Sequence, residues 1–92
     1  MNITKQKLKE LKKQANPLKN TFNIGKTGIT TNFIKQINEY FKTHEIIKIK
    51  ILNVEEKSQT LESAKIVSQK TNSIIVEVKG FTFTIYREFQ TK

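Results

Sequence analysis

The chain has 92 residues, of which 17 are basic and 8 acidic, so its net charge at pH 7 is +9. This length predicts one domain, residues 1–92, and the absence of cysteine excludes disulfides and thiolate metal sites. Since His44 is the only histidine, no pair of imidazoles is available for a metal site or a catalytic dyad, so we expect neither enzyme activity nor a cofactor.

The basic charge favours a polyanionic partner. The 17 basic residues are 16 lysines and one arginine, Arg87. Lysine acts on phosphate as a point charge, whereas arginine favours bidentate recognition, so the composition indicates affinity for a phosphate backbone more than sequence readout. A lysine-rich surface that is only solvated is the alternative. No apolar run approaches the roughly 18–20 residues of a membrane span, and no signal peptide is recognisable, so we expect a cytoplasmic protein without a membrane partner.

The positive charge is concentrated near the N-terminus. Residues 1–20 carry six lysines and one glutamate, a net charge of +5, whereas residues 53–62 carry one lysine and three glutamates, a net charge of −2. Residues 4–15 predict an amphipathic helix, because apolar residues such as Leu8 and Leu11 recur at helical spacing beside the lysines. The lysines that we assign to a binding surface are Lys5, Lys9, Lys12, Lys13 and Lys19.

The stretch from Gly25 to Gly28 is the most informative in the sequence, because it holds two of only three glycines, around Lys26 and Thr27. It follows a short predicted strand, residues 21–24, and precedes a helical pattern. A polyanion can approach the main chain closely at glycines, and the start of a helix offers unpaired N–H groups and a positive dipole end. KH domains clamp backbone nucleotides with a G-x-x-G loop. A tight strand-to-helix turn is the simpler explanation of the same pattern.

The middle of the chain predicts a helix, a strand and a further helix. The first helix is predicted from about residue 30 to residue 43, with a buried face formed by Phe33, Ile37, Tyr40 and Phe41. In the strand, residues 46–52, isoleucines alternate with Lys48 and Lys50, and these lysines face either nucleic acid or water. The second helix is predicted at residues 55–70, with an inward face formed by Leu61, Ala64 and Val67.

The C-terminal segment predicts a β-hairpin. Strands at residues 74–78 and 81–86 flank a two-residue loop, Lys79-Gly80, in which the glycine supplies a positive φ. All cross-strand pairs are then expected to lie on one face. These pairs are Val78 with Phe81, Val76 with Phe83, and Ile74 with Ile85.

The predicted order of elements is α-β-α-β-α-β-β, which belongs to the α/β class. The first two strands are joined through a helix, so we expect them to be parallel, whereas the final hairpin is antiparallel. The sequence therefore predicts a mixed four-stranded sheet packed with helices.

Three segments of the chain resemble the CRM domain (chloroplast RNA splicing and ribosome maturation) in its stand-alone YhbY-like form. The run from Asn16 to Lys19 is similar to an HPLKP-like run of the family, although Asn16 and Asn20 stand where the family often has His and Pro. The G-x-x-G loop with the following Ile29-Thr30 resembles the family's signature. Residues 44–50 are similar to its HELIKVK segment. The resemblance spans roughly residues 3–88, in the family's order.

This resemblance implies a fold similar to the C-terminal domain of translation initiation factor 3. It also implies RNA binding and association with precursors of the large ribosomal subunit. The family's RNA-contacting loop corresponds here to Gly25, Lys26, Thr27 and Gly28. We therefore expect a monomeric, non-catalytic protein that binds ribosomal RNA through this loop and the neighbouring lysines.

Two other functions remain open at this point. Small basic α/β domains also coat DNA, but such proteins use a long basic hairpin arm, and this chain has a two-residue hairpin loop with one lysine. The protein could instead be a protein-interaction module whose lysines keep it in solution. RNA binding that depends on salt separates the last case from the others.

Overall fold

The structure is a computed structural model and describes residues 4–25, 28–52 and 58–88. The elements follow the order that the sequence predicts. They are α1 (Lys5–Ala15), β1 (Phe22–Ile24), α2 (Thr31–Tyr40), β2 (Ile46–Ile51), α3 (Ser58–Thr71), β3 (Ile74–Lys79) and β4 (Thr82–Tyr86).

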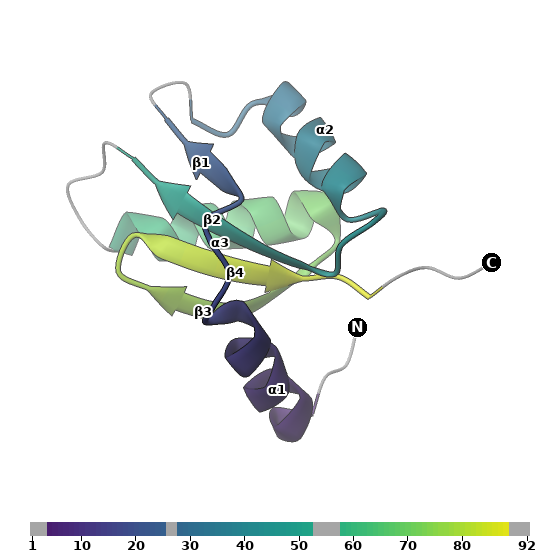
Figure 1. The fold of residues 1–92 in the computed structure, drawn as a ribbon. Coiled ribbons are helices and arrows are strands. Elements are labelled where there is room, and N and C mark those ends of the chain that lie inside the picture. Colours follow the sequence, from purple (N-terminus) through teal and green to yellow (C-terminus); the bar gives the residue numbers. More distant parts are fainter. Residues whose placement is uncertain (1–3, 26–27, 53–57, 89–92) are drawn as a thin grey trace.

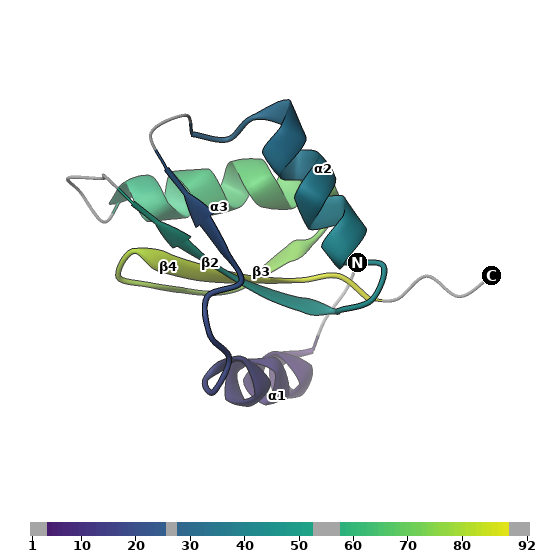
Figure 2. The ribbon, with the colours of Figure 1, turned by 45° about the horizontal axis from the view of Figure 1, so that its top comes forward.

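One mixed sheet forms the middle layer. Its strand order is β1-β2-β4-β3, with β1 and β2 parallel and the other neighbours antiparallel. Helices α2 and α3 cover one face of the sheet, and α1 lies against the other (Figures 1 and 2). The α/β fold with a mixed four-stranded sheet is confirmed, and the helix between β1 and β2 accounts for their parallel pairing.

The larger core lies between the sheet and helices α2 and α3. The period of two in β2 places Ile47, Ile49 and Ile51 on this face, where each is at most 4 % exposed. Phe33 and Ile37 of α2 pack against them, as their helical spacing predicts. Burying each of these side chains stabilises the fold by about 1.5–3 kcal/mol.

A smaller core lies under α1 on the opposite face. Leu11 of α1 packs with Val76 and Tyr86 of the hairpin, and the ammonium group of Lys7 lies 5.8 Å from the centre of the Tyr86 ring. Burial, together with the nearby carboxylates of Glu45 and Glu88, raises the pKa of Tyr86 above its ordinary value. This core fixes α1 over one end of the sheet.

Arg87 joins the end of β4 to both helices of the other face. Its guanidinium donates to Asn38 Oδ1 at 3.0 Å and to the carbonyl oxygen of Thr71 at 2.8 Å. It also lies over the Phe41 ring, with the guanidinium carbon 4.6 Å from the ring centre. The only arginine of the chain is therefore engaged in holding α2, α3 and β4 together.

The inward face of the third helix differs from the prediction. Ala64 and Val67 are fully buried as predicted, but Leu61 is 43 % exposed and Thr60 is fully buried in its place. The buried positions Thr60, Ala64, Val67 and Thr71 follow the spacing i, i+4, i+7, i+11, whereas the predicted set drifts around the helix. The predicted start at residue 55 lies outside the described residues.

The predicted register of the hairpin was also wrong. The two loop residues are Gly80 and Phe81, and Val78 pairs with Phe83. Gly80 has φ +61°, which matches the preference of type II′ turns for glycine at the first loop position. A bulge between Ile75 and Glu77 then shifts the register. As a result Val76 packs on the α1 face, and the predicted pairs do not share one face.

Candidate nucleic-acid interface

The G-x-x-G loop joins the end of β1 to the start of α2 (Figure 1). The amide N–H of Gly28 donates to the carbonyl oxygen of Gly25 at 3.0 Å, which closes a four-residue turn. Gly28 has φ +70°, a conformation that favours glycine, so its place in the turn is explained by the backbone. Lys26 and Thr27, the predicted charge and hydroxyl of the site, lie outside the described residues.

Within the described residues, nothing comparable requires glycine at position 25. Its φ does not lie in the left-handed region. A Cβ atom built on Gly25 would meet no atom of the described residues within 4 Å. The main chain at this position is therefore open to close approach by a ligand, which is what the phosphate-gripping interpretation of the loop requires.

Helix α2 begins beside the loop. Thr30 is its N-cap, and the Thr30 hydroxyl accepts a hydrogen bond of 3.0 Å from the amide of Phe33. The positive end of the helix dipole therefore adjoins the glycine turn, where it favours a negatively charged group.

A hollow of about 370 Å³ lies between the loop, the end of β2 and the first half of α3. Gly25 and Gly28 form part of its wall. Leu52 and Ile66 contribute apolar surface and are 40 % and 43 % exposed, respectively. Three isoleucines and three side chains of α3, one of them a carboxylate, complete the lining: Ile24, Ile29, Ile51, Gln59, Glu62 and Ser63. Apolar surface beside polar groups suits a flat nucleobase next to a phosphate at the loop.

The lysines of the N-terminal helix are not brought next to this loop. Lys5, Lys9 and Lys13 are exposed and Lys12 is half-buried, all on α1. Figures 1 and 2 both show α1 beyond the sheet from α2, at the end of the molecule opposite the β1–α2 connection. Lys19, also exposed, lies in the connection from α1 to β1. The predicted site residues therefore form two separate groups.

Three further lysines lie on the sheet face that carries α1. The alternation in β2 turns Lys48 and Lys50 away from the isoleucine core and onto this face. Lys79 of β3 lines the same hollow as Lys48. The sequence alone placed Lys48 and Lys50 on the face away from the isoleucines and left open whether they face nucleic acid or water. Lys79 was not among the predicted site residues, because its place depends on the hairpin register, which was predicted incorrectly.

A metal site and a membrane-spanning helix are both absent from the part of the chain that the structure describes. Residues 4–25, 28–52 and 58–88 contain no group of three or more His, Asp or Glu side chains that could hold a metal ion. Within the same residues, no helix has the length and apolar character needed to cross a membrane.

The chain is similar in sequence to several known proteins. The model of the CRS1/YhbY (CRM) domain family matches residues 3–87. The Probable RNA-binding protein YqeI of Bacillus subtilis is 31 % identical over 87 residues, which cover 94 % of this chain and 88 % of YqeI. The CRM-domain containing factor CFM3 of Zea mays, chloroplastic/mitochondrial, is 23 % identical over 95 % of this chain but only 10 % of its own length.

A solved structure shares the fold. The solution structure of SAV1595 from Staphylococcus aureus, described as a hypothetical protein and a candidate RNA-binding protein, superposes with a TM-score of 0.82. The two chains are 33 % identical, and the match covers 98 % of this chain and 93 % of SAV1595.

Proposed function

The chain belongs to the CRS1/YhbY (CRM) domain family, and we propose that it is a non-catalytic RNA-binding protein that acts in ribosome assembly. In this proposal a cytoplasmic monomer binds ribosomal RNA in precursors of the large subunit. The descriptions of YqeI and SAV1595 as RNA-binding proteins support the choice of RNA. The net charge of +9 supports a polyanionic partner.

The observation that carries the proposal is the open main chain at Gly25. Neither backbone geometry nor packing within the described residues requires glycine there. A phosphate that must reach the backbone does require it, because a side chain would hold the phosphate away. The dipole end of α2 adds attraction for the same group.

In this proposal the hollow beside the loop binds the base of the nucleotide whose phosphate lies at the loop. A phosphate held at Gly25 and Gly28 places its base near Leu52 and Ile66, and stacking a base on apolar surface removes both from water. Single-stranded or looped RNA can present a base in this way, whereas a paired duplex cannot.

DNA coating is less well supported than RNA binding. The β3–β4 hairpin has a two-residue turn, and the amide of Ile51 donates to the carbonyl oxygen of Phe81 at 2.8 Å, which ties that turn to β2. The hairpin therefore does not project as a basic arm.

The proposal is tested by reversing the charge of the loop. In the variant Lys26→Asp/Thr27→Asp, two carboxylates stand where a phosphate is expected, and we predict RNA binding at least tenfold weaker, about 1.4 kcal/mol or more. The matched control is Lys42→Asp/Thr43→Asp, because this exposed Lys-Thr pair lies at the other end of α2. Circular dichroism establishes that both variants are folded.

Gradient fractionation of cell extracts then tests the place of action. We expect the wild-type chain and the control to sediment with large-subunit precursors at moderate salt and to be released at high salt. The loop variant is expected in the free fractions. If the wild type is found only in free fractions or with DNA, the assignment to ribosome assembly is wrong. If the folded loop variant binds RNA with wild-type affinity, the loop is only a turn.

A further inference from the structure

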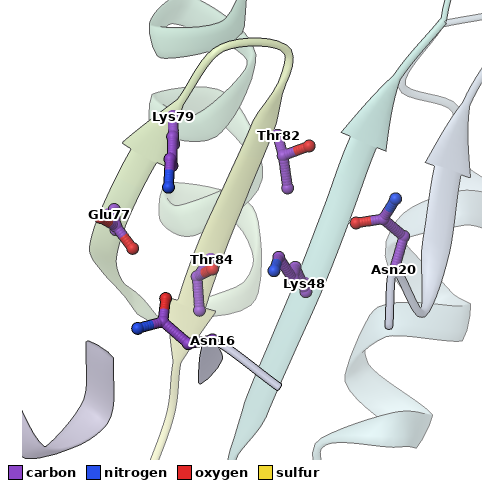
Figure 3. A pocket seen from close by; sticks show the side chains of 7 residues that line it. All are labelled: Asn16, Asn20, Lys48, Glu77, Lys79, Thr82 and Thr84. Carbon is purple, nitrogen blue, oxygen red and sulfur yellow. The ribbon is translucent and has the colours of Figure 1, made fainter. Parts of the chain in front are cut away.

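Helix α1 covers only part of its face of the sheet. Its apolar contacts are with Ile46, Ile74, Val76 and Tyr86, which lie toward one end of strands β2, β3 and β4. The uncovered part of this face is a polar hollow of about 650 Å³, here called the sheet-face groove (Figure 3). It is lined by Asn16, Asn20, Lys48, Glu77, Lys79, Thr82 and Thr84.

The strand register arranges the polar strand residues of this face in two rows across the sheet, and the rows also include Asn23 and Lys50, which lie outside the groove lining. In the first row, Lys48 lies beside Thr84, and Thr84 lies beside Glu77. The second row continues onto the edge strand, and its members in order are Asn23, Lys50, Thr82 and Lys79. The second row contains two lysines and no carboxylate.

The second row leads from the groove to the G-x-x-G loop. Asn23 is exposed on β1 and precedes Gly25 by two residues, which is about 7 Å along a strand. Lys50 and Lys79 stand on the two strands that flank Thr82, so their Cα atoms are about 10 Å apart. Two lysines at this spacing can contact different phosphates of one RNA.

The opposite margin of the groove leads to the lysines of α1. Asn16, the C-cap of α1, lines the groove. Lys5, Lys9, Lys12 and Asn16 recur at i, i+4, i+7 and i+11, so they form one stripe along the flank of the helix that ends at the groove. The sheet-face groove therefore lies between the two groups of site residues that the fold keeps apart.

We propose that the sheet-face groove is a second RNA-binding site, which takes the ribose-phosphate backbone of the RNA held at the loop. The inference rests on the proposed function. Lys48 and Lys79 of the lining supply charge for phosphates, as does Lys50, which lies beside Thr82 on the neighbouring strand. The hydroxyl and amide groups of Thr82, Asn16 and Asn20 can bond to ribose 2′-hydroxyls. The groove contains no aromatic side chain among its lining residues, so it favours backbone contacts over base stacking.

Glu77 provides an internal test of this assignment. It is the one carboxylate among the described lining residues, so it repels phosphates in the groove. Glu77→Gln keeps the shape of the side chain and removes the charge. If the groove takes a phosphate backbone, the substitution tightens RNA binding; if the carboxylate instead accepts hydrogen bonds from a base, the substitution weakens it.

The main test neutralises the two lysines of the second row. The variant Lys50→Gln/Lys79→Gln is compared with Lys42→Gln/Lys70→Gln, which makes the same change in net charge at exposed positions beside α2 and on α3. The probe is a labelled stem-loop RNA with a single-stranded tail, titrated at several salt concentrations. Thermal unfolding establishes that each variant is folded.

We expect Lys50→Gln/Lys79→Gln to weaken binding about tenfold and to reduce the salt slope by about 1.4, or 0.7 for each phosphate that a lysine no longer neutralises. The control variant should change both quantities much less. Equal effects of the two variants, or weaker binding by Glu77→Gln, would overturn the assignment of the groove. If the groove variants bind like the control while the loop variant no longer binds RNA, the groove proposal fails and the proposed function stands. If the wild type does not bind RNA, both fail.

Discussion

Gly25 and Gly28 are glycines for different reasons. At Gly28 the backbone conformation demands it, whereas at Gly25 the described structure leaves free space around an ordinary backbone. The G-x-x-G pattern alone does not separate these cases, because both positions look the same in the sequence. The geometry explains Gly28 by the turn, and we attribute Gly25 to the close approach of a ligand that the proposed function requires.

Alanine substitutions at the two glycines should therefore differ in their effect on the free energy of unfolding. Gly25→Ala should leave stability unchanged or raise it by up to about 1 kcal/mol, because it restricts the unfolded chain, while weakening RNA binding about fivefold. Gly28→Ala should lower the free energy of unfolding by about 1–2 kcal/mol, since alanine is strained at positive φ. Chemical denaturation and RNA titration measure both effects. If Gly25→Ala binds RNA with wild-type affinity, the main argument that a phosphate contacts the main chain at Gly25 is lost.

At the scale of the elements, alternation and helical spacing predicted most of the fold. The isoleucines of β2 and the buried residues Phe33 and Ile37 of α2 lie where these patterns place them. The face of α3 was wrong because hydrophobicity favours Leu61, whereas packing buries Thr60. The hairpin register was wrong because the position of the turn and the bulge near Val76 depend on backbone geometry that alternation does not contain.

Among the predicted site residues, the sequence placed Gly25 and Gly28 correctly in a loop between a strand and a helix. It could not show how far α1 lies from that loop, because this depends on which face of the sheet the helix covers. The same topology decides that Lys48 and Lys79 share a groove. Their role in binding stays a prediction.

Arg87 joins three elements of the fold, and this role cannot be predicted from the amino-acid composition. Its two short hydrogen bonds and its position over Phe41 join β4 to the ends of α2 and α3. Arg87→Lys keeps the charge and loses the planar fork, so we expect the free energy of unfolding to fall by about 2 kcal/mol, as for the removal of a charged hydrogen-bonding group. RNA affinity of the folded variant should be unchanged. A large loss of affinity in the folded protein would place Arg87 in the interface instead.

At the scale of the whole molecule, we propose that RNA binding depends on lysines that lie on separate surfaces. In the proposed binding mode these surfaces are the loop, the sheet-face groove and the flank of α1, while the only arginine of the chain is engaged in the fold. Such a surface favours attraction to phosphates over reading of base sequence. Affinity should then depend strongly on salt and weakly on sequence, and the accessible backbone and splayed bases of structured RNA should be preferred to duplex DNA.

The most direct test of this account is a titration of the wild-type protein with labelled structured RNA and with duplex DNA over a range of salt concentrations. With about four to six phosphate contacts, the logarithm of the association constant for RNA should fall against the logarithm of the salt concentration with a slope of roughly −3 to −4. RNA should bind more tightly than duplex DNA at every salt concentration. Affinity for RNA that does not change with salt, or tighter binding to duplex DNA, would contradict the account.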